Sequence, residues 1–142
     1  MPASYSSPPS PEMLTILDYW RTSVERFPGK AAALSEGRVL SYAQADVLTR
    51  SLAAALVGRL GLRPAQPVAI AMPNCIEYFL AYWAVVRAGG VVAAVNTRLG
   101  PDEMAYVLSD SGAGILLTHA RVTDVISDGI RGAGNIEHVV VA

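Results

Sequence analysis

The chain has 142 residues, of which 52% are hydrophobic and 16% charged, and its formal net charge is −1. This length and composition predict one compact folded domain. The chain has 11 basic and 12 acidic residues, so it has no surplus of positive charge to neutralise a phosphate backbone. This balance disfavours nucleic-acid binding. One cysteine cannot form an internal disulfide, and with two histidines it makes a poor zinc ligand set. We therefore expect a reducing, cytoplasmic setting and no metal site.

The first eleven residues are mostly proline and serine and carry no charged side chain. We expect residues 1–11 to be a disordered leader and the folded domain to span residues 12–142. No secretory signal or transit peptide is recognisable here. The stretch 78–95 raises the question of a membrane span. Because Arg87 lies within it and Gly89-Gly90 follows, it predicts a helix end and a buried strand instead.

Apolar residues at three- and four-residue spacing predict a first helix over 15–27, which Pro28-Gly29 ends. Two short apolar runs, 31–34 and 39–40, lie on either side of a turn with glycine at position 37. They predict a hairpin in which Gly37 supplies the positive φ of the turn.

Ser41 and Gln44 form a capping-box pattern that predicts a second helix, with Gly61 as its left-handed end. We expect this helix to bury one apolar stripe, made of Leu48, Leu52, Ala55, Leu56 and Leu60. Its charged residues, Asp46, Arg50 and Arg59, are expected to face water.

Strand and helix patterns alternate through the rest of the chain. Apolar runs predict strands at 68–72, 91–95, 115–117 and 136–141, with helices at 76–86, from 101 toward 111, and around 121–130. Asn74 and Glu77 form a second capping-box pattern. This alternation predicts an α/β fold with a doubly wound, mainly parallel sheet and flanking helices.

The helix at 76–86 is apolar around most of its circumference. It should therefore be buried, or lie against something outside this chain. Tyr78, Tyr82 and Val85 form one side, whose exposure would lead to self-association.

Motifs for nucleotide binding are missing from the sequence. No Gly-x-Gly-x-x-Gly turn follows the strand at 68–72, and the only lysine, Lys30, is not part of a phosphate loop. Gly129, Gly132 and Gly134 are expected at a helix terminus and loop. A redox-type nucleotide-binding domain is therefore the weakest hypothesis.

Several residues are candidates for chemistry, although a structural role is favoured for each. Cys75 in a first helical turn could be a reactive thiolate, but no histidine is near it in sequence. His119 follows a strand at the edge where α/β sites gather, and the 96–98 segment, with Arg98, could hold an anion there. The remaining candidates are aromatic and are expected in the core or at a domain interface: Tyr78, Tyr82 and Trp83.

Several short segments follow one another in a characteristic order along the chain. They are Phe27-Pro-Gly-Lys-Ala-Ala-Ala33, Leu40-Ser-Tyr-Ala-Gln44, Leu52-Ala with Gly61-Leu62, Pro67-Val-Ala-Ile-Ala-Met-Pro-Asn74, Arg87-Ala-Gly-Gly-Val-Val92, Val95-Asn-Thr-Arg-Leu99 and 103–113. In combination they resemble the start of the AMP-forming acyl-CoA synthetases, the adenylate-forming ligases or AMP-binding enzymes. The similarity covers residues 15 to about 141. Minor departures, at 93–95 and at Gln66, leave the subfamily open.

The resemblance implies the N-terminal subdomain of such a ligase, incomplete relative to the family. The family reaction converts a carboxylic or fatty acid, ATP and CoA into acyl-CoA, AMP and pyrophosphate, and Mg²⁺ is implied for the complete enzyme. The family's phosphate loop ending in Pro-Lys-Gly, its aromatic-Gly-Thr-Glu segment, its ribose-binding aspartate and its mobile C-terminal domain have no counterpart here. We therefore assign no catalytic, cofactor-binding or metal residue, and expect the chain alone to be inactive and to bind no cofactor.

Two functional hypotheses stay open. In the first, the chain is the N-terminal fragment of a ligase, whose partners are the downstream subdomains or a separate chain that supplies them. In the second, it is a free-standing α/β binding or interaction module derived from that fold. The acid substrate, its chain length and the oligomeric state are left open by the sequence.

Overall fold

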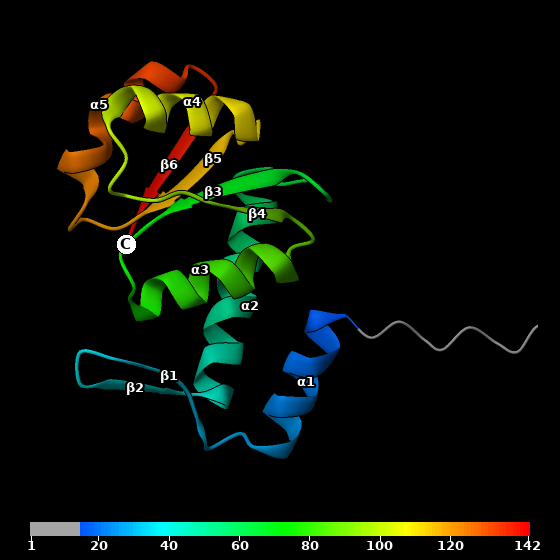
Figure 1. Ribbon diagram of the computed structural model, residues 1–142. Coiled ribbons are helices and arrows are strands. Elements are labelled where there is room, and N and C mark those ends of the chain that lie inside the picture. The colour runs from blue at the N-terminus through cyan, green and yellow to red at the C-terminus, as the bar shows by residue number, and fades with distance from the viewer. Residues whose placement is uncertain (1–14) are drawn as a thin grey trace, which may run out of the picture.

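The computed structural model describes residues 15–142, so the leader predicted at 1–11 lies outside the described residues. A four-stranded sheet lies between two layers of helices, and α1 and the β1–β2 hairpin extend from one end of this core (Figure 1). The elements, in chain order, are α1 (Ile16–Arg26), β1 (Ala31–Ser35), β2 (Arg38–Ser41), α2 (Tyr42–Gly58), β3 (Pro67–Ala71), α3 (Ile76–Arg87), β4 (Val91–Ala94), α4 (Pro101–Ser111), β5 (Ile115–Thr118), α5 (Thr123–Ala133) and β6 (His138–Val141).

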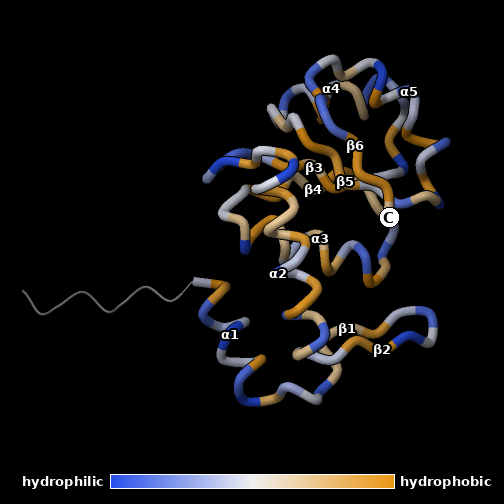
Figure 2. Tube along the Cα trace, turned by 180° about the vertical axis from the view of Figure 1, so that it is seen from behind, coloured by the Kyte–Doolittle hydropathy of each residue, from blue (hydrophilic) through white to orange (hydrophobic). Residues whose placement is uncertain are grey.

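The central sheet has the order β4-β3-β5-β6, and all its neighbouring strands are parallel. Helices α2 and α3 pack on one face, and α4 and α5 on the other. Residues 68–71 of β3 are fully buried, as expected for a strand covered on both faces. Figure 2 shows β3 and β5 as hydrophobic segments inside this arrangement. The prediction of a doubly wound α/β fold is confirmed.

The first helix and the hairpin form as predicted. The Thr15 hydroxyl accepts the Asp18 amide at 3.3 Å, and the Asp18 carboxylate accepts the Thr15 amide at 2.8 Å, which completes a capping box at the start of α1. In the hairpin, Glu36 and Gly37 both have positive φ, 51° and 74°. Two consecutive positive φ values match the twist of paired strands, so this short turn joins β1 to β2.

The predicted capping box of α2 is also present. The Ser41 hydroxyl accepts the Gln44 amide at 3.2 Å, and the Gln44 side-chain oxygen accepts the Ser41 amide at 3.0 Å. The orientation expected for α2 is wrong at two positions, however. Asp46 is only 6% exposed instead of facing water, whereas Leu48 is 46% exposed. The helix ends at Gly58, and Gly61 takes the expected left-handed conformation beyond it.

Asp46 is buried because donors from three helices satisfy its carboxylate. Trp20 of α1 donates its indole N–H to Oδ1 at 3.0 Å, Arg50 of α2 approaches Oδ2 at 2.6 Å, and Arg87 of α3 pairs with Oδ1. Burial opposes ionisation of Asp46 most strongly, but the hydrogen bonds from Trp20 and Arg50 and the charge of Arg87 together lower its pKa. A charged carboxylate therefore joins α1, α2 and α3.

Residues 78–95 are divided between α3 and β4, as predicted. Within residues 15–142, none of the helices has the length and apolar character that crossing a membrane requires. Val85 is fully buried, and Tyr78 and Tyr82 are half-buried against the same core cluster. Burial of this side within the chain, the first of the two expectations, is therefore confirmed for Val85, whereas the two tyrosines stay partly exposed.

The capping box predicted at Asn74 is wrong. The N-cap of α3 is Cys75, and no side chain caps this helix. Asn74 is exposed in the loop before it. Glu77, the other member of the predicted box, instead pairs with Arg38 of β2 at 2.7 Å. A long-range ion pair thus replaces the local hydrogen bond.

The prediction for the glycines near the C-terminus is right only for Gly134, which ends α5 with a φ of 67°. Gly129 and Gly132 lie inside the helix. A Cβ at Gly129 would overlap the Met104 side chain of α4, and one at Gly132 would lie 2.9 Å from Ala105 Cβ. Both glycines therefore permit the close packing of α5 on α4.

Candidate functional site

The carboxyl end of the sheet is where α/β folds of this order bind ligands. Strands β3 and β5 are neighbours, but the chain leaves β3 toward α3 on one face and leaves β5 toward α5 on the other. Ligands of doubly wound sheets bind where neighbouring strands diverge in this way. The loops that follow β3, β4 and β5 therefore define the candidate site.

An open cavity of about 730 Å³ lies at the ends of β3 and β4. Arg98 is exposed at its wall, and no carboxylate among the described residues pairs with it. The Asn96 side-chain oxygen accepts the Arg98 amide at 3.0 Å, which is the loop-fixing role that the sequence favoured for this segment. The lining residues are Met72, Pro73, Asn74, Tyr78, Ala94, Val95, Asn96, Thr97 and Arg98.

A second open cavity, of about 390 Å³, separates the hairpin from the start of α3. It shares Asn74 and Tyr78 with the first cavity. The lining residues are Ala32, Ala33, Leu34, Ser35, Asn74, Cys75, Ile76, Tyr78, Phe79 and Tyr82. The cavity beside the hairpin has a largely apolar lining, and the cavity beside β4 has a more polar one.

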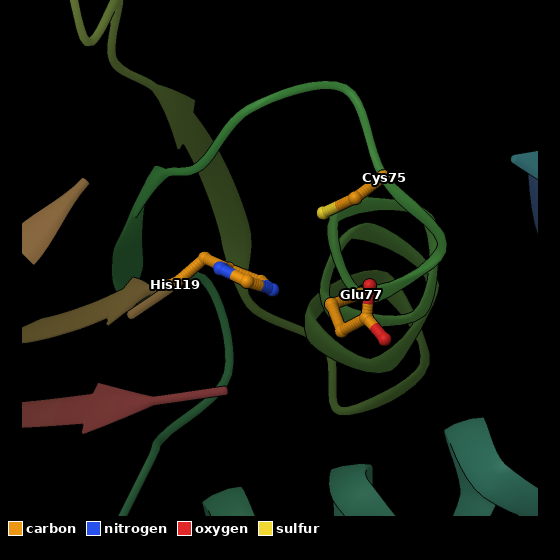
Figure 3. A group of neighbouring side chains, drawn as sticks. All are labelled: Cys75, Glu77 and His119. Carbon is orange, nitrogen blue, oxygen red and sulfur yellow. The ribbon is translucent and has the colours of Figure 1, made fainter. Parts of the chain in front are cut away.

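The fold brings Cys75 and Glu77 close to His119 at the carboxyl ends of β3 and β5, although His119 is far from the other two in sequence. One ligand atom of each residue lies within 4.8 Å of the others. In Figure 3 the Cys75 sulfur and the His119 ring face one another across the gap between α3 and the end of β5, and Glu77 lies beside them on the first turn of α3. The sequence argument against Cys75 was the lack of a nearby histidine, and the fold supplies one.

Two ion pairs connect the hairpin to the surroundings of this cluster. Arg38 of β2 bonds to Glu77, and this hydrogen bond lowers the pKa of the carboxyl below its usual value. Glu36, at the tip of the hairpin, pairs with Arg121 in the loop after β5. The Arg121 amide in turn donates to His119 Nδ1 at 3.1 Å, which leaves Nε2 free. These two ion pairs therefore hold the hairpin next to the Cys75–Glu77–His119 cluster.

The aromatic candidates serve packing, as the sequence predicted. The Trp83 ring lies 4.5 Å from that of Trp20 and 5.8 Å from that of Tyr82. Phe79 also packs on Trp20, at 5.8 Å between ring centroids. These contacts join α1 to α3, and offset or tilted arrangements of this kind stabilise aromatic pairs.

Comparison with known proteins shows which family this chain belongs to. Residues 20–141 match the family model described as AMP-binding enzyme. The long-chain-fatty-acid–CoA ligase of Escherichia coli O157:H7 is 33% identical over 103 residues, which are 72% of this chain and 18% of the ligase. Gramicidin S synthase 2 of Brevibacillus brevis is 30% identical over 112 residues, which are 79% of this chain and 2% of that protein. The chain thus spans less than a quarter of the length of these relatives.

A solved structure agrees with the sequence relatives. The anthranilate CoA ligase AuaEII, crystallised in complex with anthranoyl-AMP, superposes with a TM-score of 0.82 at 25% identity. The match covers 89% of this chain and 24% of that one. The similarity to the ligases lies in their N-terminal portion. The family model accounts for nearly all the described residues, and the chain belongs to the AMP-binding enzyme family.

Proposed function

We propose that this chain supplies the N-terminal part of an AMP-forming acid–CoA ligase. In that reaction a carboxylate oxygen attacks the α-phosphate of ATP, the bond to the β-phosphate breaks, and pyrophosphate leaves. The thiol sulfur of CoA then attacks the acyl carbon, the thiol loses its proton, and AMP leaves. The match of residues 20–141 to the AMP-binding enzymes carries this proposal.

The carboxyl end of the sheet is the part of this chain that we propose to face the rest of the enzyme. Its two cavities are open, and Arg98 contributes a positive charge to one of them. A charge at the border of an open cavity supports a role as one wall of a larger site. ATP, Mg²⁺ and CoA are proposed for the complete enzyme, with Mg²⁺ supplying charge neutralisation to the phosphates.

The chain alone is proposed to be inactive. Its only lysine, Lys30, packs its ammonium group 4.2 Å from the Phe27 ring, between α1 and β1. The connection from β3 to α3 passes through residues 72–75 and contains no glycine. Holding a triphosphate needs several convergent donors, such as the amides of a glycine-rich loop, a lysine and a bound magnesium ion. This set has no counterpart at the carboxyl end of the sheet in the described residues.

The proposed acid substrate is a fatty acid, since the E. coli relative is named for long-chain fatty acids. The similarity to Gramicidin S synthase 2 and to an anthranilate CoA ligase makes other acids the alternatives. The proposed partners are the downstream ligase subdomains, whether on the same chain or a separate one. We further propose that the folded domain extends over residues 12–142 and that the protein acts in the cytoplasm. When the downstream subdomains are missing, the domain is proposed to self-associate.

The reading frame beyond Ala142 tests the proposal. We expect a Ser/Thr/Gly-rich stretch followed by Pro-Lys-Gly downstream or in a neighbouring gene. A verified stop after Ala142 in an intact, expressed gene, with no such sequence nearby, would favour the free-standing binding module.

A further inference from the structure

The Cys75–Glu77–His119 cluster lies at the carboxyl ends of β3 and β5, and the proposed ligase function makes no use of it. Cys75 is fixed as the N-cap of α3, and Glu77 is in the first turn of the same helix. His119 directly follows β5, whose last residue, Thr118, donates its hydroxyl to the Ala71 carbonyl at the end of β3 at 2.8 Å. Two independent elements therefore hold the three side chains at the place where a doubly wound sheet binds ligands.

We propose that Cys75, Glu77 and His119 bind a divalent cation of the zinc type. Thiolate sulfur, imidazole nitrogen and carboxylate oxygen are the three donor types that proteins offer to Zn²⁺. Bond lengths of about 2.0–2.3 Å place the ligand atoms of a tetrahedral site about 3.3–3.8 Å apart. The observed separations, within 4.8 Å, need a closure of about 1 Å, which rotation of the half-buried side chains supplies. Three protein ligands leave the fourth position to water or an external group.

The charges around the cluster are compatible with a cation. Two arginines lie nearby, but each is paired with a carboxylate, Arg38 with Glu77 and Arg121 with Glu36. Arg38 also holds Glu77 Oε1 at 2.7 Å, which orients the carboxylate. Carboxylate ligands are commonly oriented by such outer hydrogen bonds. The Cys75 thiol binds as the thiolate and releases its proton to solvent.

The His119 ring gives the metal-bound state a recognisable signature. In the structure Nδ1 accepts the Arg121 amide, so the neutral ring carries its proton on Nε2. Coordination through Nε2 moves that proton to Nδ1, and the Arg121 amide loses its acceptor. Metal binding is therefore expected to change the environment of the 119–121 loop as well as that of the ligands.

Cobalt titration of the purified 142-residue chain tests the proposal directly. Co²⁺ substitutes for Zn²⁺, and a thiolate-to-cobalt charge-transfer band in this chain can come only from Cys75, the single cysteine. We expect one equivalent to bind, with the charge-transfer band and the visible bands of tetrahedral cobalt, and Zn²⁺ to displace it. The backbone amide resonance of Arg121 should shift on addition of Zn²⁺.

Ligand variants distinguish this site from weak surface binding. His119→Gln and Glu77→Gln should each weaken Zn²⁺ binding by about tenfold or more, and Cys75→Ser should abolish the charge-transfer band. The matched control is His138→Gln, because His138 is the other histidine and is exposed at the opposite end of the sheet. Its affinity should equal that of the unmodified chain. Circular dichroism checks that each variant folds.

Two results would overturn the proposal. One is a folded chain that shows no thiolate-to-cobalt band at saturating Co²⁺. The other is an affinity for Zn²⁺ that is unchanged in folded His119→Gln or Glu77→Gln. A rise in the melting temperature with Zn²⁺, seen in the unmodified chain and in His138→Gln but lost in His119→Gln, would provide independent support.

Discussion

Trp20 donates its indole N–H to the Asp46 carboxylate at 3.0 Å, and this bond connects the first helix to the core of the domain. Arg87 on α3 binds the same oxygen, so three helices meet at one buried charge. Asp46→Ala would leave the 17%-exposed Arg87 without its partner and the Trp20 N–H without an acceptor. Removing one member of a buried pair is strongly destabilising. We expect the free energy of unfolding to fall by about 3 kcal/mol in urea denaturation.

The control for that variant is Asp128→Ala. Asp128 pairs with Arg131 on the surface of α5, where both side chains are more than half exposed. Because solvent screens exposed pairs, its loss should change the free energy by less than about 0.5 kcal/mol. Equal effects of the two substitutions would contradict the role assigned to Asp46.

Stability should also depend on pH through Asp46. Its pKa is lower in the folded chain than in the unfolded chain, where aspartate titrates near about 3.9, so the unfolded state binds the proton more tightly. The stabilising contribution is therefore present above about pH 4 and is lost as the pH falls through the lower folded-state pKa. Urea midpoints measured from pH 7 to pH 3 should fall less steeply for Asp46→Asn than for the unmodified chain. Parallel curves would rule out this contribution.

The two helix caps allow a matched comparison. Ser41→Ala removes the hydroxyl that accepts the Gln44 amide and should cost about 1 kcal/mol of unfolding free energy. Asn74→Ala changes an exposed loop residue that caps nothing and should stay within about 0.5 kcal/mol. Chemical denaturation of both variants measures the difference. A larger cost for Asn74→Ala would restore the cap that the sequence had indicated.

Gly129→Ala tests the packing of α5 on α4. The added methyl group would overlap Met104, so we expect a loss of about 1–3 kcal/mol, which is typical of overpacking. Gly58→Ala is the matched substitution in α2, where nothing lies within 4 Å of the added carbon. It should be neutral or stabilise by up to about 1 kcal/mol. If Gly129→Ala proves as stable as Gly58→Ala, α4 and α5 are less closely packed in solution than in the structure.

The sequence predicted the elements well because their signals are local. Apolar spacing and the Ser41–Gln44 box identify α1 and α2, and unbroken apolar runs identify the buried strands. It failed where a partner lies on another element. Asp46 looks like a solvent-facing helix residue until Trp20 and Arg87 are placed beside it.

The candidate cluster was missed for the same physical reason. Cys75 and His119 meet only because β5 lies next to β3, and strand order is not contained in local periodicity. The start of α3 was predicted less accurately, because the capping pattern at Asn74 indicates a helix start but the actual N-cap is Cys75, one residue later.

Acid-dependent exchange of pyrophosphate into ATP tests the proposed ligase function most directly. The purified 142-residue chain should give no exchange above background with fatty acids, since its one lysine lies between α1 and β1 and not in the loops at the carboxyl end of the sheet. The product of the complete reading frame, extended to include the Pro-Lys-Gly segment, should give acid-dependent exchange, and acyl-CoA once CoA is added. Two results would contradict this function. One is exchange by the 142-residue chain itself that is lost on mutating one of its own residues, such as Arg98. The other is an extended product that carries the Pro-Lys-Gly segment and folds but catalyses no exchange.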